Sequence, residues 1–325
     1  MANQQQQHTP SDEQQAGWER ELIGKVALAA ITEQKTARRW GIFFKLLGFA
    51  YLSVILSVSM YPQFKEEISS GKQHAAIIDV RGVIGEDDGA SAKTVIAGLQ
   101  DAIKDKNTKG VIFNINSPGG SPVQSAYIYD EIRRQKLLHP DLPIYTVVAD
   151  ICASGGYYIA AASDKIYVNQ SSLIGSIGVI MNGFGFSNVL DKLGVERRLL
   201  TAGEHKALLD PFSPVKKDEL RHMQTQLDQV HEQFINAVRA GRGDRIKDAD
   251  AGQLFSGLIW TGAEGVKLGL ADDFGSVDSV AREVLGTEET VNFTPQEHLL
   301  DRLAGKLGAS FGQVLGSLLK LDGVR

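Results

Sequence analysis

The sequence predicts an α/β domain with a mainly parallel sheet, preceded by one membrane-spanning helix. From residue 74 onward, short apolar runs alternate with amphipathic helical stretches, which is typical of strand–turn–helix repetition. An apolar stretch of 22 residues lies at 40–61. Glycine accounts for 34 of the 325 residues, and these glycines cluster in the middle of the chain, where sharp strand-to-helix turns are needed.

The composition excludes several classes of protein. With 43% hydrophobic residues, the chain is too apolar to be disordered and long enough to bury a core. Its 34 basic and 39 acidic residues give a net charge of −5, so nucleic-acid binding has no electrostatic support. The single cysteine, Cys152, excludes a disulfide framework and a cysteine-based zinc site.

The N-terminal quarter predicts a membrane anchor. Residues 1–39 comprise a Gln-rich polar tail and an amphipathic helix from about residue 18. As a helix, residues 40–61 span roughly 33 Å, which matches a hydrocarbon core of ~30 Å. The alternatives are a buried core helix and a cleaved signal peptide. The 39 preceding residues and the flanking charges favour an uncleaved anchor.

The charges on either side of this anchor predict its orientation. The positive-inside rule places the N-terminus in the cytoplasm and residues 62–325 outside it. Five basic residues precede the apolar stretch and two follow it closely: Arg20, Lys25, Lys35, Arg38 and Arg39 before, Lys65 and Lys72 after.

After a linker at 62–73, residues 74–286 are expected to form the folded domain. Strands are expected at 75–84, 110–116, 143–150 and 165–169, and helices at 91–105, 122–137 and 154–163. Glycine-rich turns are expected at 117–121 and 153–156, after the second and third strands. Catalytic groups of such sheets collect at the carboxyl ends of strands, so these turns are where the site is expected.

Two further amphipathic stretches have open assignments. Residues 216–240 form a long helix with an apolar stripe, which indicates either a core-facing side or a subunit interface. The C-terminal extension, 287–325, contains an amphipathic stretch at 298–321 that three glycines interrupt. It could cap the domain, contact a neighbouring subunit or lie on a membrane surface.

Ser154 is the candidate nucleophile. It lies in Ala153-Ser-Gly-Gly-Tyr157, with a small residue before it and two glycines after it. A serine at a strand-to-helix turn needs such neighbours so that its Oγ is exposed and a substrate backbone can approach. The plain alternative is that Ser154 only caps the helix that follows.

The candidate base is a lysine. None of the seven histidines lies in a motif typical of a catalytic triad, and His205 alone lies in a glycine-bounded loop, directly before Lys206. A lysine can act as general base when desolvation keeps its amine neutral. The alternative is an ordinary solvated lysine.

Four motifs in this order resemble the signal peptide peptidase A family of serine–lysine proteases, over residues 75–285. They are Asn116-Ser-Pro-Gly-Gly120, Ala153-Ser-Gly-Gly-Tyr-Tyr158, Leu173-Ile-Gly-Ser176-Ile-Gly-Val-Ile180 and Gly203-Glu-His-Lys206. Ser154 and Lys206 are 52 residues apart in sequence, as in the short, single-repeat members. The resemblance implies a Clp-protease/crotonase-like α/β superfold with an N-terminal transmembrane helix.

The resemblance also implies roles. Ser154 is the nucleophile, Lys206 its base, and Ser176 orients the lysine amine. The amides of Gly120 and Gly155 form the oxyanion hole. Two departures are an absent aromatic residue before the lysine and an absent arginine at 256–262.

The expected protein is a membrane-anchored serine endopeptidase of the bacterial inner membrane, with its catalytic domain periplasmic or extracytoplasmic. By resemblance it degrades residual signal peptides and hydrophobic segments through an acyl-enzyme, with no metal or other cofactor, and assembles as a ring-shaped homo-oligomer. The alternatives are a catalytically inactive membrane scaffold and a crotonase-like acyl-CoA enzyme, which would not need Ser154 and Lys206 together.

Overall fold

A computed structural model describes residues 12–69, 71–86, 89–246 and 251–295. The chain divides into two compact units, Met1–Ile68 and Ser69–Arg325.

The first unit is one continuous helix, α1, which runs from Asp12 to Ser69. Its segment Gly24–Ser57 is long and apolar enough to cross a membrane, with a mean hydropathy of 1.7, and no other helix among the described residues meets this condition. This segment is compatible with a single membrane anchor. The helix begins before the amphipathic helix expected from about residue 18, and it continues through most of the expected linker at 62–73.

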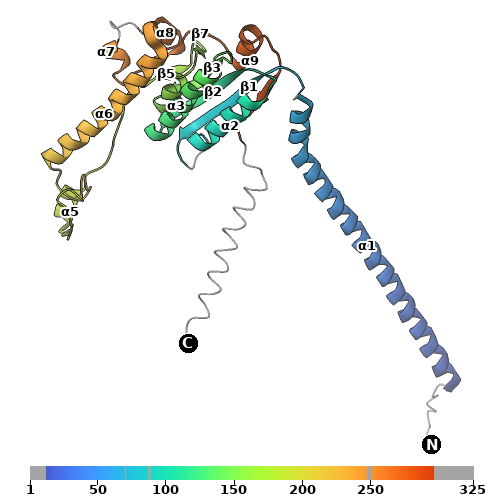
Figure 1. Ribbon diagram of the computed structural model, residues 1–325. Coiled ribbons are helices and arrows are strands. Elements are labelled where there is room, and N and C mark those ends of the chain that lie inside the picture. The colour runs from blue at the N-terminus through green and yellow to red at the C-terminus, as the bar shows by residue number, and fades with distance from the viewer. Residues whose placement is uncertain (1–11, 70, 87–88, 247–250, 296–325) are drawn as a thin grey trace, which may run out of the picture. The chain divides into compact units, whose positions relative to one another are not determined.

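The second unit contains an eight-stranded sheet (Figure 1). The order is β6-β5-β3-β2-β1-β8, and β4 pairs with both β3 and β7. Every pairing is parallel except β5 with β6, so the sheet is mixed but mainly parallel, as predicted. The strands are β1 His74–Ile84, β2 Thr108–Gly120, β3 Ile144–Ala153, β4 Lys165–Val168, β5 Leu173–Gly175, β6 Ile259–Thr261, β7 Asp273–Phe274 and β8 Thr290–Asn292.

The helices begin where the sequence supplies caps. The Ser91 and Ser121 side chains accept hydrogen bonds from amides in the first turns of α2 and α3, and Thr261 forms a capping box with Glu264 at α8. The helices are α2 Ala92–Lys104, α3 Pro122–Leu138, α4 Gly155–Ala160, α5 Ser187–Leu193, α6 Lys217–Arg242, α7 Ala251–Leu254, α8 Gly262–Lys267 and α9 Val277–Ser279, which a π-helical turn, Val280–Val284, follows.

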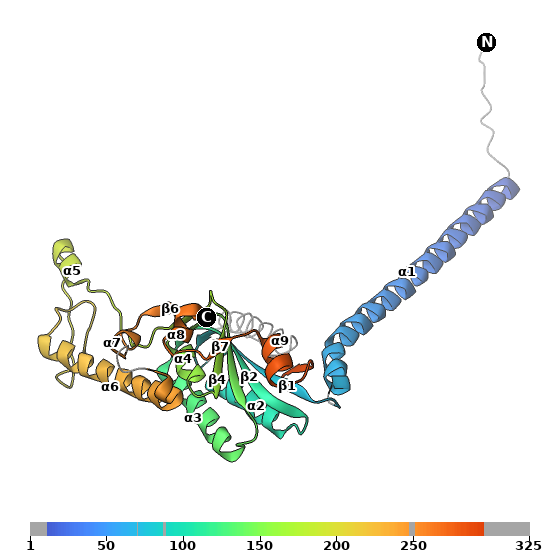
Figure 2. The ribbon, with the colours of Figure 1, turned by 90° about the horizontal axis from the view of Figure 1, so that it is seen from above.

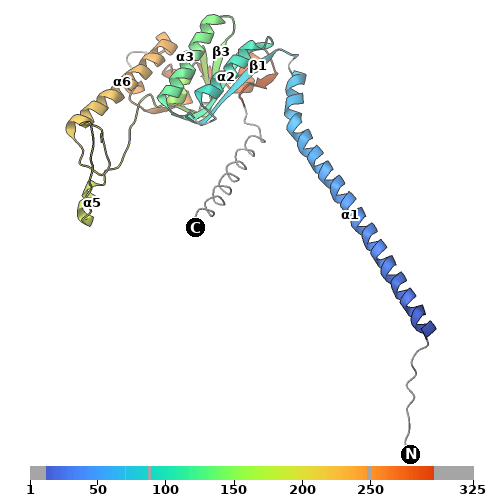
Figure 3. The ribbon, with the colours of Figure 1, turned by 60° about the horizontal axis from the view of Figure 1, so that its bottom comes forward.

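The core lies on both faces of the sheet. On one face, α2 and α3 lie side by side (Figure 3), and they pack with α4 and the C-terminal part of α6 against β1, β2 and β3. On the other face, Val280, Ala281 and Leu285 cover the amino-terminal halves of the strands. Burial on both faces explains why β1 begins as a continuous apolar run instead of an alternating one.

Three sequence expectations need correction or completion. Residues 117–120, expected as a turn, are the end of β2, because Gly119 and Gly120 pair with Val83 and Ile84 of β1. The sheet continues past residue 286, since β8 pairs with β1. The amphipathic stretch at 298–321 lies outside the described residues.

The apolar stripe of the 216–240 helix has two different environments. Phe234 and Val238, near the C-terminal end of α6, are buried in the core, whereas Leu220 near its start is 51% exposed. The core-facing interpretation therefore holds for only the last part of the stripe.

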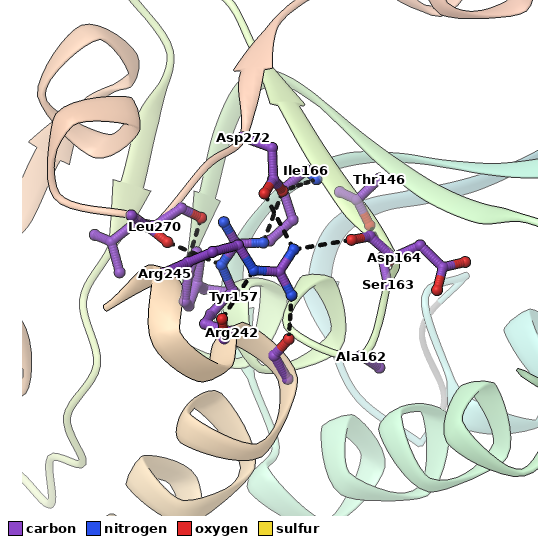
Figure 4. Close-up of polar contacts among 12 residues, drawn as sticks. Thr146, Tyr157, Ala162, Ser163, Asp164, Ile166, Arg242, Arg245, Leu270 and Asp272 are labelled. Atoms are coloured by element: carbon purple, nitrogen blue, oxygen red, sulfur yellow. Dashed lines mark hydrogen bonds and ion pairs between the residues drawn. The ribbon is translucent and has the colours of Figure 1, made fainter. Parts of the chain in front are cut away.

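A buried ion pair ties α6 to the strand layer (Figure 4). The Arg242 side chain is fully buried and donates to the Asp272 carboxylate at 2.7 Å, and Arg245 contacts the other oxygen at 3.1 Å. Asp272 also accepts the Ile166 amide at 2.7 Å. Burial raises the pKa of Asp272, but the hydrogen bond and charge of Arg242, together with hydrogen bonds from the Ile166 amide and Arg245, outweigh it, so the pKa lies below its ordinary value.

Asp272→Asn is expected to lower the free energy of unfolding at neutral pH by about 3–5 kcal/mol, because it leaves Arg242 buried without a counter-charge. The folded-state pKa of Asp272 is depressed, so its contribution is present above the unfolded-state pKa and is lost as the pH falls through the folded-state value. The deficit should therefore shrink in acid. Urea unfolding at pH 7 and at pH 3–4 measures it.

The matched control is Asp273→Asn, an exposed neighbour whose carboxylate accepts only its own strand's Phe274 amide among the contacts of described residues. It should unfold like the wild type. Equal stability of Asp272→Asn and Asp273→Asn would show that the buried pair adds nothing.

Candidate active site

Ser154 lies at the turn between β3 and α4, with φ 51° and ψ −121°. A residue other than glycine in this region costs roughly 1–3 kcal/mol, a strain that proteins keep mainly at functional sites. Its amide donates to the Gly175 carbonyl at 2.8 Å, and its carbonyl accepts from Tyr158 at 2.9 Å. Its hydroxyl makes no capping bond to α4. Ser154 therefore occupies the N-cap position of α4 without a side-chain capping bond.

The glycines of β2 lie directly against this turn. A Cβ added to Gly119, at φ 106°, would lie 2.7 Å from the Ser154 Cβ and 2.8 Å from the Gly155 nitrogen. A Cβ added to Gly155 would lie 3.3 Å from the Gly120 nitrogen. The two amides predicted for the oxyanion hole, Gly120 and Gly155, are thus neighbours beside the serine.

Sequence reasoning missed the role of Gly119. It selected Gly120 for its amide, but Gly119 is the position where only hydrogen fits between β2 and the serine turn. The glycine pair in the motif was the available signal. Which of the two glycines makes the close approach depends on the pairing of β2, and that is not a local property.

Ser176 is brought close to Ser154 by strand pairing. Ala153 at the end of β3 pairs with Gly175 at the end of β5. Ser154 and Ser176, the next residues, therefore follow the ends of two neighbouring strands. Ser176 also has a positive φ, 52°, and its amide donates to the Leu258 carbonyl at 2.7 Å. Strand pairing therefore brings Ser176 beside Ser154.

Lys206 is exposed and lies in a segment between β5 and α6 that extends to the far end of α6 (Figures 1 and 2). Its neighbour His205 contacts Glu219, near the start of α6, at 3.3 Å. The Ile177 carbonyl, next to Ser176, contacts His231 at 3.1 Å. Glu219 and His231 are 12 residues apart on one helix, or roughly 18 Å. Within the described part of the chain, no hydrogen bond joins Lys206 to Ser154.

Polar contacts join this segment to the start of α6. Glu219, 5% exposed, accepts from Lys216 at 3.1 Å as well as contacting His205. The hydrogen bond from Lys216 is the largest cause that lowers the pKa of Glu219. The segment's apolar side chains are nevertheless open to solvent: Ile180 is 86%, Phe184 81% and Leu200 97% exposed.

Cys152 is a packing residue. It is fully buried in the core, and burial raises the pKa of its thiol far above the ordinary value. A protonated, enclosed thiol does not compete with Ser154 as a nucleophile. Among the described residues, no group of three or more histidine, cysteine or carboxylate side chains is arranged to hold a metal ion.

Ser154 is thus a strained serine at a strand-to-helix turn of a mainly parallel α/β sheet, with the Gly120 and Gly155 amides beside it, an arrangement that hydrolases use for acyl transfer. Residues 136–291 match the model of peptidase family S49, and residues 69–174 match the Clp protease model. The chain belongs to peptidase family S49. This confirms the resemblance to the signal peptide peptidase A family.

Several known proteins are similar to this chain. A Brucella abortus protein named Na(+)/H(+) antiporter NhaA is 41% identical over 217 residues, which are 66% of this chain and 29% of that protein. A putative signal peptide peptidase SppA of Enterococcus faecium is 37% identical over 198 residues, 59% of this chain and 56% of that one. The putative protease slr0021 of Synechocystis is 30% identical over 208 residues, 64% of this chain and 72% of that one.

This chain therefore spans less than two thirds of the first two relatives. Among solved structures, a mutant of the 1510-N membrane-bound stomatin-specific protease superposes with a TM-score of 0.42 and 18% identity. The match covers 70% of this chain and 96% of that one.

Proposed function

We propose that the protein is a membrane-anchored serine endopeptidase that uses Ser154 and Lys206. The observation that carries this proposal is the Ser154 turn. Its hydroxyl makes no capping bond, its backbone is strained, and the amides of Gly120 and Gly155 lie beside it. These are the parts that acyl transfer needs, a nucleophile and donors for a developing oxyanion.

In this mechanism the Ser154 Oγ attacks the peptide carbonyl and gives its proton to the neutral amine of Lys206. The Gly120 and Gly155 amides donate to the resulting oxyanion. Lys206 then returns the proton to the leaving amine, and water hydrolyses the acyl-enzyme by the reverse route. Ser176 holds the lysine amine so that its lone pair points at the serine.

In this proposal, Lys206 comes close to a Ser154 only when several copies of the chain assemble. The exposed apolar side chains of the segment that carries Lys206 need cover, because large exposed apolar patches mark interaction sites. A ring-shaped homo-oligomer supplies that cover and brings Lys206 to a Ser154 of the assembly. A catalytic serine without its base in the single chain is consistent with activity that depends on assembly.

The proposed location is the bacterial inner membrane. The helix segment Gly24–Ser57 serves as a single-pass anchor, with the N-terminus cytoplasmic and the catalytic domain periplasmic or extracytoplasmic. The proposed substrates are residual signal peptides and hydrophobic segments at the membrane. The name of the Enterococcus faecium relative, a putative signal peptide peptidase, supports this substrate class.

The two rival functions do not require Ser154 to act as a nucleophile. A crotonase-like acyl-CoA enzyme uses paired amides without a nucleophilic serine, and a scaffold needs neither. Neither rival explains why a serine instead of a glycine occupies a left-handed position at φ 51°.

The test is covalent labelling of the full chain in detergent with a fluorophosphonate, followed by peptide mapping. The wild type should carry the adduct on Ser154, and Ser154→Ala should lose it completely. Ser171→Ala, which removes an exposed serine, should label normally. An unlabelled wild type, or an adduct that survives in Ser154→Ala, would overturn the proposal.

A further inference from the structure

The strands that carry the oxyanion glycines and the nucleophile are out of register next to the site. Between β1 and β2, Arg81 pairs with Asn116 and Val83 with Gly119, so β2 carries one extra residue there. Between β2 and β3, Ile115 pairs with Val148 and Ser117 with Cys152, so β3 carries two extra residues. Such bulges re-aim backbone near active sites but interrupt the hydrogen-bond ladder.

Pro118, inside the first bulge, has no N–H to give to a ladder. The backbone between Asn116 and Gly119 therefore lacks part of the support that a regular strand receives from its neighbours. This stretch leads directly into Gly119 and Gly120, whose positions relative to Ser154 determine the oxyanion hole. Contacts other than the strand ladder must therefore hold the backbone between Asn116 and Gly119 in place.

The Ser117 hydroxyl replaces the interrupted contacts on the β1 side. The side chain is fully buried, and its Oγ donates to the Gly82 carbonyl at 2.6 Å while it accepts the Gly119 amide at 3.1 Å. One hydroxyl thus links Gly82, the β1 residue opposite the bulge, to the peptide that begins the glycine pair. Ser117 also borders α4, since a Cβ on Gly156 would lie 3.1 Å from the Ser117 carbonyl oxygen.

The Asn116 carboxamide makes the corresponding hydrogen bonds to β3. Its oxygen accepts the Ile151 amide at 3.3 Å, and its nitrogen donates to the Asp150 carboxylate at 2.8 Å. Ile151 is three residues before Ser154. Adjacent side chains of β2 therefore connect the glycine pair to β1 and to the strand that carries the nucleophile.

We propose that Ser117, supported by Asn116, is a positioning residue that holds the Gly119–Gly120 backbone at the distance from Ser154 that an oxyanion hole requires. Ser117 does not touch the substrate. It acts through the Gly119 peptide, whose rotation would turn the Gly120 amide away from the developing oxyanion. The inference rests on the proposed serine mechanism.

The main variant is Ser117→Ala. Its labelling rate with a fluorophosphonate should fall roughly ten- to hundredfold, since displacements of about 1 Å at a catalytic site have effects of this size. With a hydrophobic fluorogenic peptide the loss should appear in kcat, with KM unchanged, because the oxyanion forms only during reaction.

Ser163→Ala is the matched control. Ser163 is also a buried serine, 1% exposed, whose hydroxyl bonds to Thr146 at 2.7 Å, away from the site. The substitution removes a buried hydrogen bond of the same kind, so it should lower Tm comparably and leave kcat near the wild-type value. A loss of kcat in both variants, in step with Tm, would make Ser117 merely structural and overturn the inference.

Asn116→Ala provides a second readout, because this half-buried side chain tolerates truncation more readily than Ser117. A reduced kcat at wild-type Tm supports the inference even if Ser117→Ala does not fold. If Ser117→Ala folds and keeps the wild-type kcat, the inference is overturned. If Ser117→Ala does not fold, a wild-type kcat in Asn116→Ala overturns it. An unlabelled wild type overturns the serine mechanism itself, and the inference with it, so the two failures are distinguishable.

Discussion

Replacing Lys206 with arginine is expected to abolish peptide hydrolysis without unfolding the protein. The side chain is exposed in the single chain, and arginine keeps its charge and approximate length. A guanidinium cannot give up its proton under these conditions, so it cannot accept one from Ser154. Peptide hydrolysis and circular dichroism, measured on the same preparation, test this expectation.

Lys192→Arg is the control, since Lys192 is another exposed lysine of the same segment, in the last turn of α5. It should retain full activity. If folded Lys206→Arg hydrolyses peptides at a substantial rate, the serine–lysine dyad is wrong and a different base must be sought.

Mixing two inactive variants tests whether the lysine comes from the same chain as the serine or from a neighbouring copy of the chain. The roughly 18 Å of helix between the contacts of His205 and of Ile177 favours a neighbouring copy. Ser154→Ala and Lys206→Arg chains, dissociated and assembled together, should then recover part of the activity. No recovery in mixed assemblies would assign each lysine to the serine of its own chain.

The parts of the fold that depend on local sequence were predictable. Alternating apolar and amphipathic runs located β1, α2, α3 and β4, and capping residues such as Ser91 and Ser121 marked the helix starts. The Ser154 turn was also predictable, because small residues on both sides of a serine leave its hydroxyl accessible and let the backbone turn sharply. Each of these signals lies within a few residues of the feature it predicts.

What could not be predicted depends on contacts between distant segments. The motif at 117–120 contains proline and two glycines and so indicates a turn, yet pairing with β1 makes it the end of a strand. Asp272 looks like any surface acid until Arg242, 30 residues away, is seen buried against it. The position of Lys206 depends on contacts with α6 that no local pattern reveals.

Gly119→Ala is expected to reduce hydrolysis by at least about 100-fold, the effect of roughly 1 Å of misplacement at a reacting centre. The added Cβ would lie 2.7 Å from the Ser154 Cβ, 2.8 Å from the Gly155 nitrogen and 2.9 Å from the Ala153 oxygen. None of these is the flexible end of a side chain, so β2 or the serine turn must move. Either movement separates Ser154 from the Gly120 and Gly155 amides.

Gly243→Ala separates this steric effect from the cost of backbone conformation. Gly243 has φ 55° and no heavy atom within 4 Å of an added Cβ, so alanine there meets the unfavourable backbone region without a clash. It should lower Tm by a few degrees, equivalent to about 1 kcal/mol, and leave kcat unchanged. Gly119→Ala should lower both Tm and kcat. If Gly119→Ala keeps its kcat and loses only as much Tm as Gly243→Ala, then β2 does not approach the serine as closely in solution, and the oxyanion hole must be built from other amides.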